Sequence, residues 1–80
     1  MDVVQEIHDY IAAEFTPERG SLAPDENLLA QGIIDSMGIL KLVTFLEERF
    51  GIEAIDDDLV PENFASIETL AAFVERKRNG

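Results

Sequence analysis

The feature that most constrains the fold is the stretch 36–50, which has the period of an amphipathic helix and a boundary signal at each end. Asp35 precedes the stretch as a good N-cap residue, and Gly51 follows it as a typical C-terminal terminator. At about 100° per residue, its apolar side chains share one broad face. These side chains are Ile39, Leu42, Val43, Leu46 and Phe50. Because such a face must be covered, residues 36–50 predict a helix that packs against other helices.

Two further helices are expected near the ends of the chain. After Asp2, a potential N-cap, apolar residues recur at spacings of three and four and predict a helix over about residues 2–15. The apolar positions are Val3, Val4, Ile7, Ile11 and Phe15. Ser66 can cap a closing helix over residues 66–78, whose basic last turn complements the helix dipole. The apolar stripe of this helix is Ile67, Leu70, Ala71 and Val74.

The connections predict one long loop and one short helix. Residues 16–35 are interrupted by Pro17, Gly20, Pro24 and Gly32, and we expect their isolated aliphatic residues to pin the loop across the helices. Those residues are Leu22, Leu28, Leu29, Ile33 and Ile34. Residues 59–64 suggest a short helix with Leu59 and Phe64 pointing inward. With no competing strand pattern, the expected fold is all-α: a single domain over residues 1–80, built as a small four-helix bundle of three main helices plus one short helix.

The composition narrows the partners and the compartment. Eighty residues suffice for one modest core, and six basic against seventeen acidic residues give a net charge of −11. Such a field repels nucleic acid and anionic lipid and attracts basic protein surfaces, unless it serves solubility alone. There is no cysteine, so thiol chemistry would need an added group. Without a signal peptide or a membrane-spanning run, we expect a cytoplasmic protein that does not insert into membranes.

Ser36 is the candidate functional residue. With Asp35 as the N-cap, Ser36 occupies the first helical position, where unpaired backbone N–H groups and the helix dipole favour an attached anion. This position favours a phosphate-linked modification of its hydroxyl. The alternative is a purely structural role, because Asp and Ser are both common at helix starts.

The motifs of catalysis and metal binding are absent. A serine hydrolase needs G-x-S-x-G, but Ile34 stands two residues before Ser36, and His8 has no evident acid partner that would hold it near that serine. An EF-hand counted from Asp56 fails because Pro61 occupies the position that requires glycine. We therefore expect no catalytic residue, no metal, no function for His8, and a serine that another protein modifies.

A second face of the helix over residues 36–50 is a candidate docking surface. Its members are Met37, Leu40, Lys41, Thr44 and Glu48, with Glu47 at its margin. Two large apolar side chains beside a serine, edged by acids, are typical of a small patch for transient partners. The alternative places Leu40 in the core and lets Met37 cover loop residues, because exposed apolar residues are ordinary.

Two segments carry a resemblance to a known family. Asp35-Ser36-Met37 matches the modification motif of acyl carrier and peptidyl carrier proteins, and Leu46-Glu47-Glu48-Arg49-Phe50-Gly51 is similar to the usual end of their second helix. The order of helices and loops resembles that family over nearly the whole chain. The resemblance implies that a phosphopantetheinyl transferase esterifies Ser36 with 4'-phosphopantetheine from coenzyme A. It also implies an acyl- or aminoacyl-adenylating ligase that loads the terminal thiol, a downstream acyltransferase or synthase, and a monomeric carrier.

The details of the motif favour a specialised pathway. Many fatty-acid synthase carriers have glycine three positions before the modified serine, where this chain has Ile33, and acidic residues where it has Gly38 and Lys41. Gly-Ile-Ile-Asp-Ser-Met-Gly is more similar to discrete carriers that work with adenylating ligases, including D-alanyl and peptidyl carriers. We therefore expect a specialised freestanding carrier, with housekeeping fatty-acid synthesis as the alternative. From another class, an acidic helical interaction module whose Ser36 stays unmodified also remains open.

Overall fold

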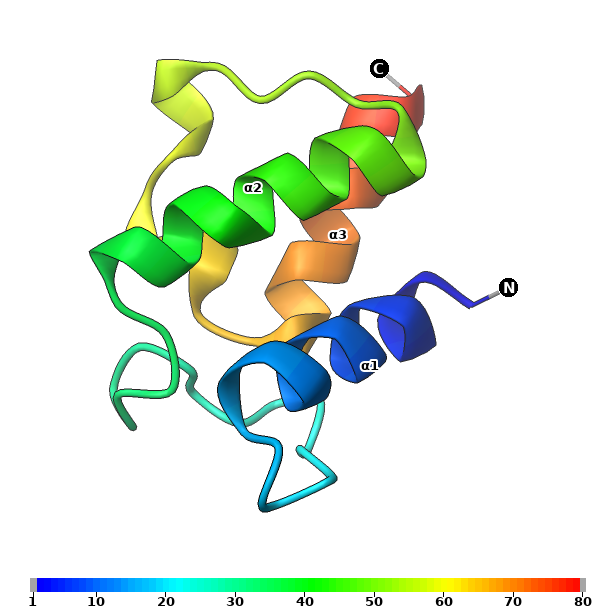
Figure 1. Cartoon of the computed structure of the whole chain (residues 1–80). Coiled ribbons are helices and arrows are strands. Elements are labelled where there is room, and N and C mark those ends of the chain that lie inside the picture. The colour runs from blue at the N-terminus through cyan, green and yellow to red at the C-terminus, as the bar shows by residue number, and fades with distance from the viewer. Residues whose placement is uncertain (1, 80) are drawn as a thin grey trace.

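The computed structural model describes residues 2–79, which form three α-helices and two short 3-10 helices with no strand in that range. The elements are α1 (Val3–Phe15), α2 (Ser36–Phe50), η1 (Asp56–Asp58), η2 (Pro61–Phe64) and α3 (Ile67–Asn79). α3 crosses behind α1 and α2 and packs against both, and the first connection runs along the end of the bundle where α1 ends and α2 begins (Figure 1). The architecture is the expected all-α one.

The core lies where the apolar faces of the helices meet. Its fully buried large side chains are Ile7, Ile11, Leu28, Leu42, Leu46, Phe64, Ile67, Leu70, Phe73 and Val74. On the predicted inner face of α2, Leu42 and Leu46 are buried, and the remaining members pack partly buried at its edge. Burial of each such side chain stabilises the fold by about 1.5–3 kcal/mol relative to exposure. None of the helices in residues 2–79 combines the length and the apolar composition needed to cross a membrane.

The helix ends follow their capping residues. α1 begins one residue after the expected start because Asp2 lies outside it as the N-cap, with its carboxylate accepting the amide of Val4 at 3.1 Å. α3 begins directly after Ser66, whose hydroxyl accepts the amide of Thr69 at 3.2 Å. The Thr69 hydroxyl oxygen accepts the Ser66 amide at 3.0 Å in return. This reciprocal pair satisfies two backbone donors at the start of the closing helix.

The long loop is pinned as predicted. Leu28 is fully buried, and its amide donates to the carbonyl of Ala65 at 2.7 Å, just before α3. Its carbonyl accepts the amides of Ile33 and Ile34 at 2.9 and 3.3 Å. Leu22 and Ile34 are also buried. Buried side chains and backbone hydrogen bonds together hold this connection against the bundle.

The short helix expected over residues 59–64 is present as η2, which begins at Pro61, two residues later than expected, and ends at Phe64. The turn η1, over Asp56–Asp58, was not expected. Pro61 is the physical reason for the later start, because it restricts Val60 to an extended conformation, observed at φ −116° and ψ 149°. Phe64 points inward as predicted, but Leu59 is 40% exposed and does not. The connection therefore makes two separate turns between α2 and α3.

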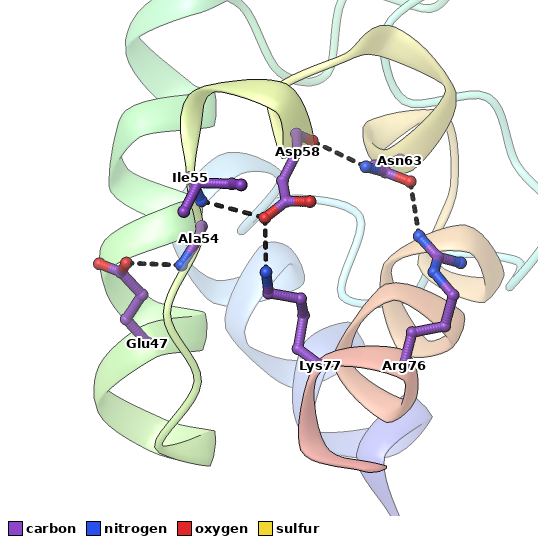
Figure 2. Close-up of polar contacts among 7 residues, drawn as sticks. All are labelled: Glu47, Ala54, Ile55, Asp58, Asn63, Arg76 and Lys77. Carbon is purple, nitrogen blue, oxygen red and sulfur yellow. Dashed lines mark hydrogen bonds and ion pairs between the residues drawn. The ribbon is translucent and has the colours of Figure 1, made fainter. Parts of the chain in front are cut away.

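Asp58 is the centre of the polar contacts that hold this second connection to α3 (Figure 2). Its Oδ2 atom accepts the amide of Ile55 at 3.0 Å and the ammonium of Lys77 at 2.8 Å, while its carbonyl accepts the side-chain amide of Asn63 at 2.7 Å. Asn63 Oδ1 in turn accepts Arg76 Nη2 at 3.0 Å. The basic last turn of α3 therefore anchors the connection as well as complementing the helix dipole.

Candidate functional site

The start of α2 is organised by Asp35. This residue is extended, with φ −120° and ψ −169°, and its carboxylate accepts the amide of Gly38 at 2.8 Å. Its carbonyl accepts the amide of Ile39 at 2.9 Å, which begins the regular helical hydrogen bonds. Ser36 is the first residue of the helix and is exposed. The arrangement presents the serine to solvent from a capped, hydrogen-bonded helix start.

The loop before this turn fixes its direction. Gly32 has φ +71°, a left-handed conformation that suits glycine. The next two residues, Ile33 and Ile34, donate their amides to the carbonyl of Leu28, and the Ile34 side chain is buried. Asp35 follows immediately. The chain therefore enters α2 from an anchored segment.

The second face of α2 is open to solvent. Met37 is 67% exposed and Leu40 is 56% exposed, so the alternative that places Leu40 in the core is wrong. Lys41, Thr44 and Glu48 are exposed as well. Together with Ser36, these five residues form one surface on the outer side of α2, which we call the α2 outer face.

Glu47 takes a different place. It is half-buried, and its Oε2 atom accepts the amide of Ala54 at 3.0 Å (Figure 2). The carboxylate therefore ties α2 to the connection that follows it. We accordingly leave Glu47 out of the α2 outer face, although the sequence placed it at the margin.

Lys41 borders an open groove between α1 and α2. The groove has a volume of about 330 Å³ and is lined by Tyr10, Lys41, Thr44, Phe45 and Glu48. The rings of Tyr10 and Phe45 stack there with centroids 4.0 Å apart. No side-chain carboxylate in residues 2–79 pairs with Lys41, whereas Arg49 on the same helix pairs with Glu6. Lys41 thus gives the α2 outer face, whose one acidic member is Glu48, a positive charge available to a partner.

His8 anchors the first loop, a role that the sequence did not reveal. Its Nε2 atom accepts the amide of Leu22 at 3.1 Å, and its Nδ1 atom lies 3.0 Å from Oδ1 of Asp9. Since Nε2 accepts, we assign the proton to Nδ1, which then donates to Asp9. The hydrogen bond from His8, with another from Gln5, lowers the pKa of Asp9 below its ordinary value. The histidine is thus engaged with the loop.

Within the described residues, no group of acidic and histidine side chains could hold a metal ion. Asp58, the last of three consecutive aspartates, is paired with Lys77. Its pKa lies below the ordinary value because the Ile55 amide and then Lys77 hydrogen-bond to the carboxylate. This carboxylate therefore has a structural partner.

Comparisons with known proteins identify the family of the chain. Residues 5–74 match the family described as "Phosphopantetheine attachment site". The chain is 28% identical to an acyl carrier protein of Campylobacter hominis over 94% of its own length and 92% of the relative's. It is 30% identical to the "Probable acyl carrier protein PigG" of a Serratia species, over 85% and 79% of the two chains.

A solved structure has a similar fold. The structure described as "Structure of KstB-PCP(apo)" superposes with a TM-score of 0.76 at 39% sequence identity, over 92% of this chain and 84% of that one. The family match, the curated relatives and this structure agree with one another. The chain belongs to the acyl and peptidyl carrier proteins, which hold a covalently attached 4'-phosphopantetheine and are substrates of other enzymes rather than catalysts.

Proposed function

We propose that Ser36 carries the 4'-phosphopantetheine and that the protein serves as a freestanding carrier of acyl or aminoacyl groups in a specialised pathway, loaded by an adenylating ligase. The single observation that supports Ser36 most strongly is its exposed position at the first residue of α2, directly after the Asp35 cap. It also lies inside the residues that match the attachment-site family.

The residues around Ser36 fit a phosphodiester. The amides of Ser36 and Met37 lie in the first helical turn, where no intrahelical acceptor is available, and the helix dipole favours negative charge. The carboxylate of Asp35 is bonded to the Gly38 amide, so it is held within the turn. The attached group would supply a terminal thiol, which this cysteine-free chain lacks.

In the transfer of phosphopantetheine, the contribution of this chain is to hold the serine hydroxyl in an exposed position. Asp35 holds the helix start, Ser36 offers its hydroxyl to solvent, and His8 is occupied at the first loop. The modifying transferase therefore supplies the base that removes the serine proton. The exposed Met37 and Leu40 give it an apolar contact beside the serine.

Three observations support a specialised pathway. Lys41 and Gly38 stand where fatty-acid synthase carriers often have acidic residues. One similar relative is described as the probable acyl carrier protein PigG, and the similar solved structure is described as KstB-PCP. The second candidate function, housekeeping fatty-acid synthesis, is favoured by the similarity to the Campylobacter hominis acyl carrier protein over almost its full length.

The attachment site can be tested by mass. Purified protein is incubated with coenzyme A, magnesium and a broad-specificity phosphopantetheinyl transferase, and its intact mass is measured. The wild type should gain one phosphopantetheine, and Ser36→Ala, which keeps the Asp35 cap, should gain none. An unmodified wild type would contradict the carrier function, and a modified Ser36→Ala would contradict the assignment of Ser36.

The pathway requires a second comparison. Holo-protein is offered to an acyl- or aminoacyl-adenylating ligase, with ATP and candidate acids, and in parallel to the malonyl-transferring enzyme of fatty-acid synthesis. Faster thioester formation by the ligase supports the specialised role. Faster loading by the fatty-acid enzyme would instead support the housekeeping role.

A further inference from the structure

Gly38 is a buried position in the first turn of α2, two residues after Ser36. Its amide donates the 2.8 Å hydrogen bond that Asp35 accepts as the N-cap. Glycine lowers helix stability relative to alanine, so its presence inside a helix calls for a local reason. Neighbouring atoms supply that reason.

A Cβ atom at position 38 would meet three neighbours. It would lie 3.0 Å from Cε1 of Phe15, 3.4 Å from Oδ1 of Asp35 and 3.4 Å from Cβ of Ile34. Carbon atoms pack best at about 3.5–4.0 Å, so the contact with the Phe15 ring is too short to tolerate unchanged. The absence of a side chain at Gly38 lets the last residue of α1 pack directly against the first turn of α2.

The half-buried Phe15 ring belongs to a row of aromatic contacts. Its edge packs against Tyr10, with centroids 6.2 Å apart and planes at 78°. Tyr10 stacks on Phe45 of α2, which contacts Phe50 edge-on with centroids 6.1 Å apart. The four rings form a continuous row across α1 and α2, so displacement of Phe15 would disturb the packing of both helices.

We infer that Gly38 and Phe15 act together as a positioning pair for the modification of Ser36. The ring of Phe15 supports the first turn of α2, and this support holds the Asp35 cap and the serine in one orientation for the transferase. The inference rests on the proposed function of Ser36. Gly38 acts through Phe15 and Asp35 and does not itself react.

Gly38→Ala separates this inference from simple helix propensity. Propensity alone predicts a more stable α2 and unchanged modification. The positioning pair predicts that kcat/KM for the carrier, measured with a phosphopantetheinyl transferase at saturating coenzyme A, falls by about tenfold or more, because small displacements of a reacting group are costly. The KM for coenzyme A should stay unchanged, because the transferase binds coenzyme A.

The matched control is the same substitution in a Phe15→Leu background. Leucine removes the ring atom that the new Cβ would meet, so Gly38→Ala should then change kcat/KM by less than about twofold relative to Phe15→Leu alone. Amide NMR spectra should show the Gly38→Ala perturbation concentrated at residues 34–39, with α3 little affected. A thermal melt of each variant reports whether it is folded at the assay temperature.

Two results would overturn the inference. Gly38→Ala could be modified as fast as the wild type, or the loss could be equally large with and without Phe15→Leu. Failure of the proposed function has a different signature, because then the wild type gains no phosphopantetheine or Ser36→Ala still gains it. The mass measurement therefore tests the proposed function of Ser36. The kcat/KM values of Gly38→Ala with and without Phe15→Leu test the positioning pair separately.

Discussion

The exposure of a single residue, Leu40, distinguishes a side chain that can dock a partner from one that packs in the core. Its side chain is 56% exposed on α2, whereas Leu42, two residues later, is fully buried. Helical geometry directs residues two positions apart to different sides, so one leucine serves the core and the other faces solvent. An exposed leucine beside Ser36 offers apolar surface at little cost in stability.

We expect Leu40→Asp to impair loading while leaving the fold intact. The exposed substitution should change the free energy of unfolding by no more than about 0.5 kcal/mol. Transferase or ligase turnover should fall by about tenfold, because the new charge removes an apolar contact and must be desolvated on docking. Steady-state kinetics and circular dichroism together check this. Leu42→Asp is the matched control, in which the burial of a carboxylate should destroy helicity.

Individual side chains were predictable where neighbouring residues decide their role. The Asp35 cap depends on residues within one helical turn, and the sequence indicated it. The hydrogen bond from Leu22 to His8 joins residues 14 positions apart, and the contact between Gly38 and Phe15 joins two helices. No periodic or local signal encodes such contacts, because the tertiary packing of the loop and helices creates them.

At the scale of elements, the helices and the connections differ in what holds them. The helices bury apolar faces, but no residue of Glu53–Asn63 is buried, and this connection is held by the polar contacts around Asp58 (Figure 2). The strong periodicity of the helices made them predictable almost to the residue. The turn η1 was missed because Lys77, which stabilises it through Asp58, lies 19 residues away. The start of η2 was placed two residues early because Val60, before Pro61, is extended.

The contacts of Asp58 predict a pH-dependent contribution to stability. Its pKa in the folded protein lies below its ordinary value of 3.8, so the carboxylate stabilises the fold above that pH, and this contribution is lost as the pH falls through the folded pKa. Asp58→Asn should therefore lower the Tm near neutral pH, and its difference from wild type should shrink below about pH 4. Thermal melts across that range check the expectation.

Asp57→Asn provides the control for charge alone. Asp57 lies in the same turn, is exposed and takes no part in the contacts of Figure 2. Its substitution removes one negative charge without breaking the bonds to Ile55 and Lys77. If the two variants melted alike at every pH, the contacts of Asp58 would not stabilise the connection.

At the scale of the whole molecule, the distribution of charge suits transient exchange between enzymes. The net charge is −11, and four of the six basic residues form ion pairs within the structure. Most of the positive charge is thereby neutralised locally, and the excess of carboxylates sets the long-range field. A field of one sign accelerates encounter with basic partners without requiring tight binding.

This field makes the use of the carrier dependent on salt. Raising the ionic strength from about 0.05 M to about 0.5 M shortens the Debye length from about 14 Å to about 4 Å, so the KM of a transferase for the carrier should rise several-fold. The kcat should change little, because the contacts made after docking are short. Initial rates at several salt concentrations, with the KM for coenzyme A measured in parallel, separate screening of the carrier from general inhibition.

Lys41→Glu, which adds negative charge to the α2 outer face, should steepen the salt dependence of the KM with a basic partner. A KM independent of salt in both the wild type and Lys41→Glu would show that apolar contact at Met37 and Leu40 governs docking instead.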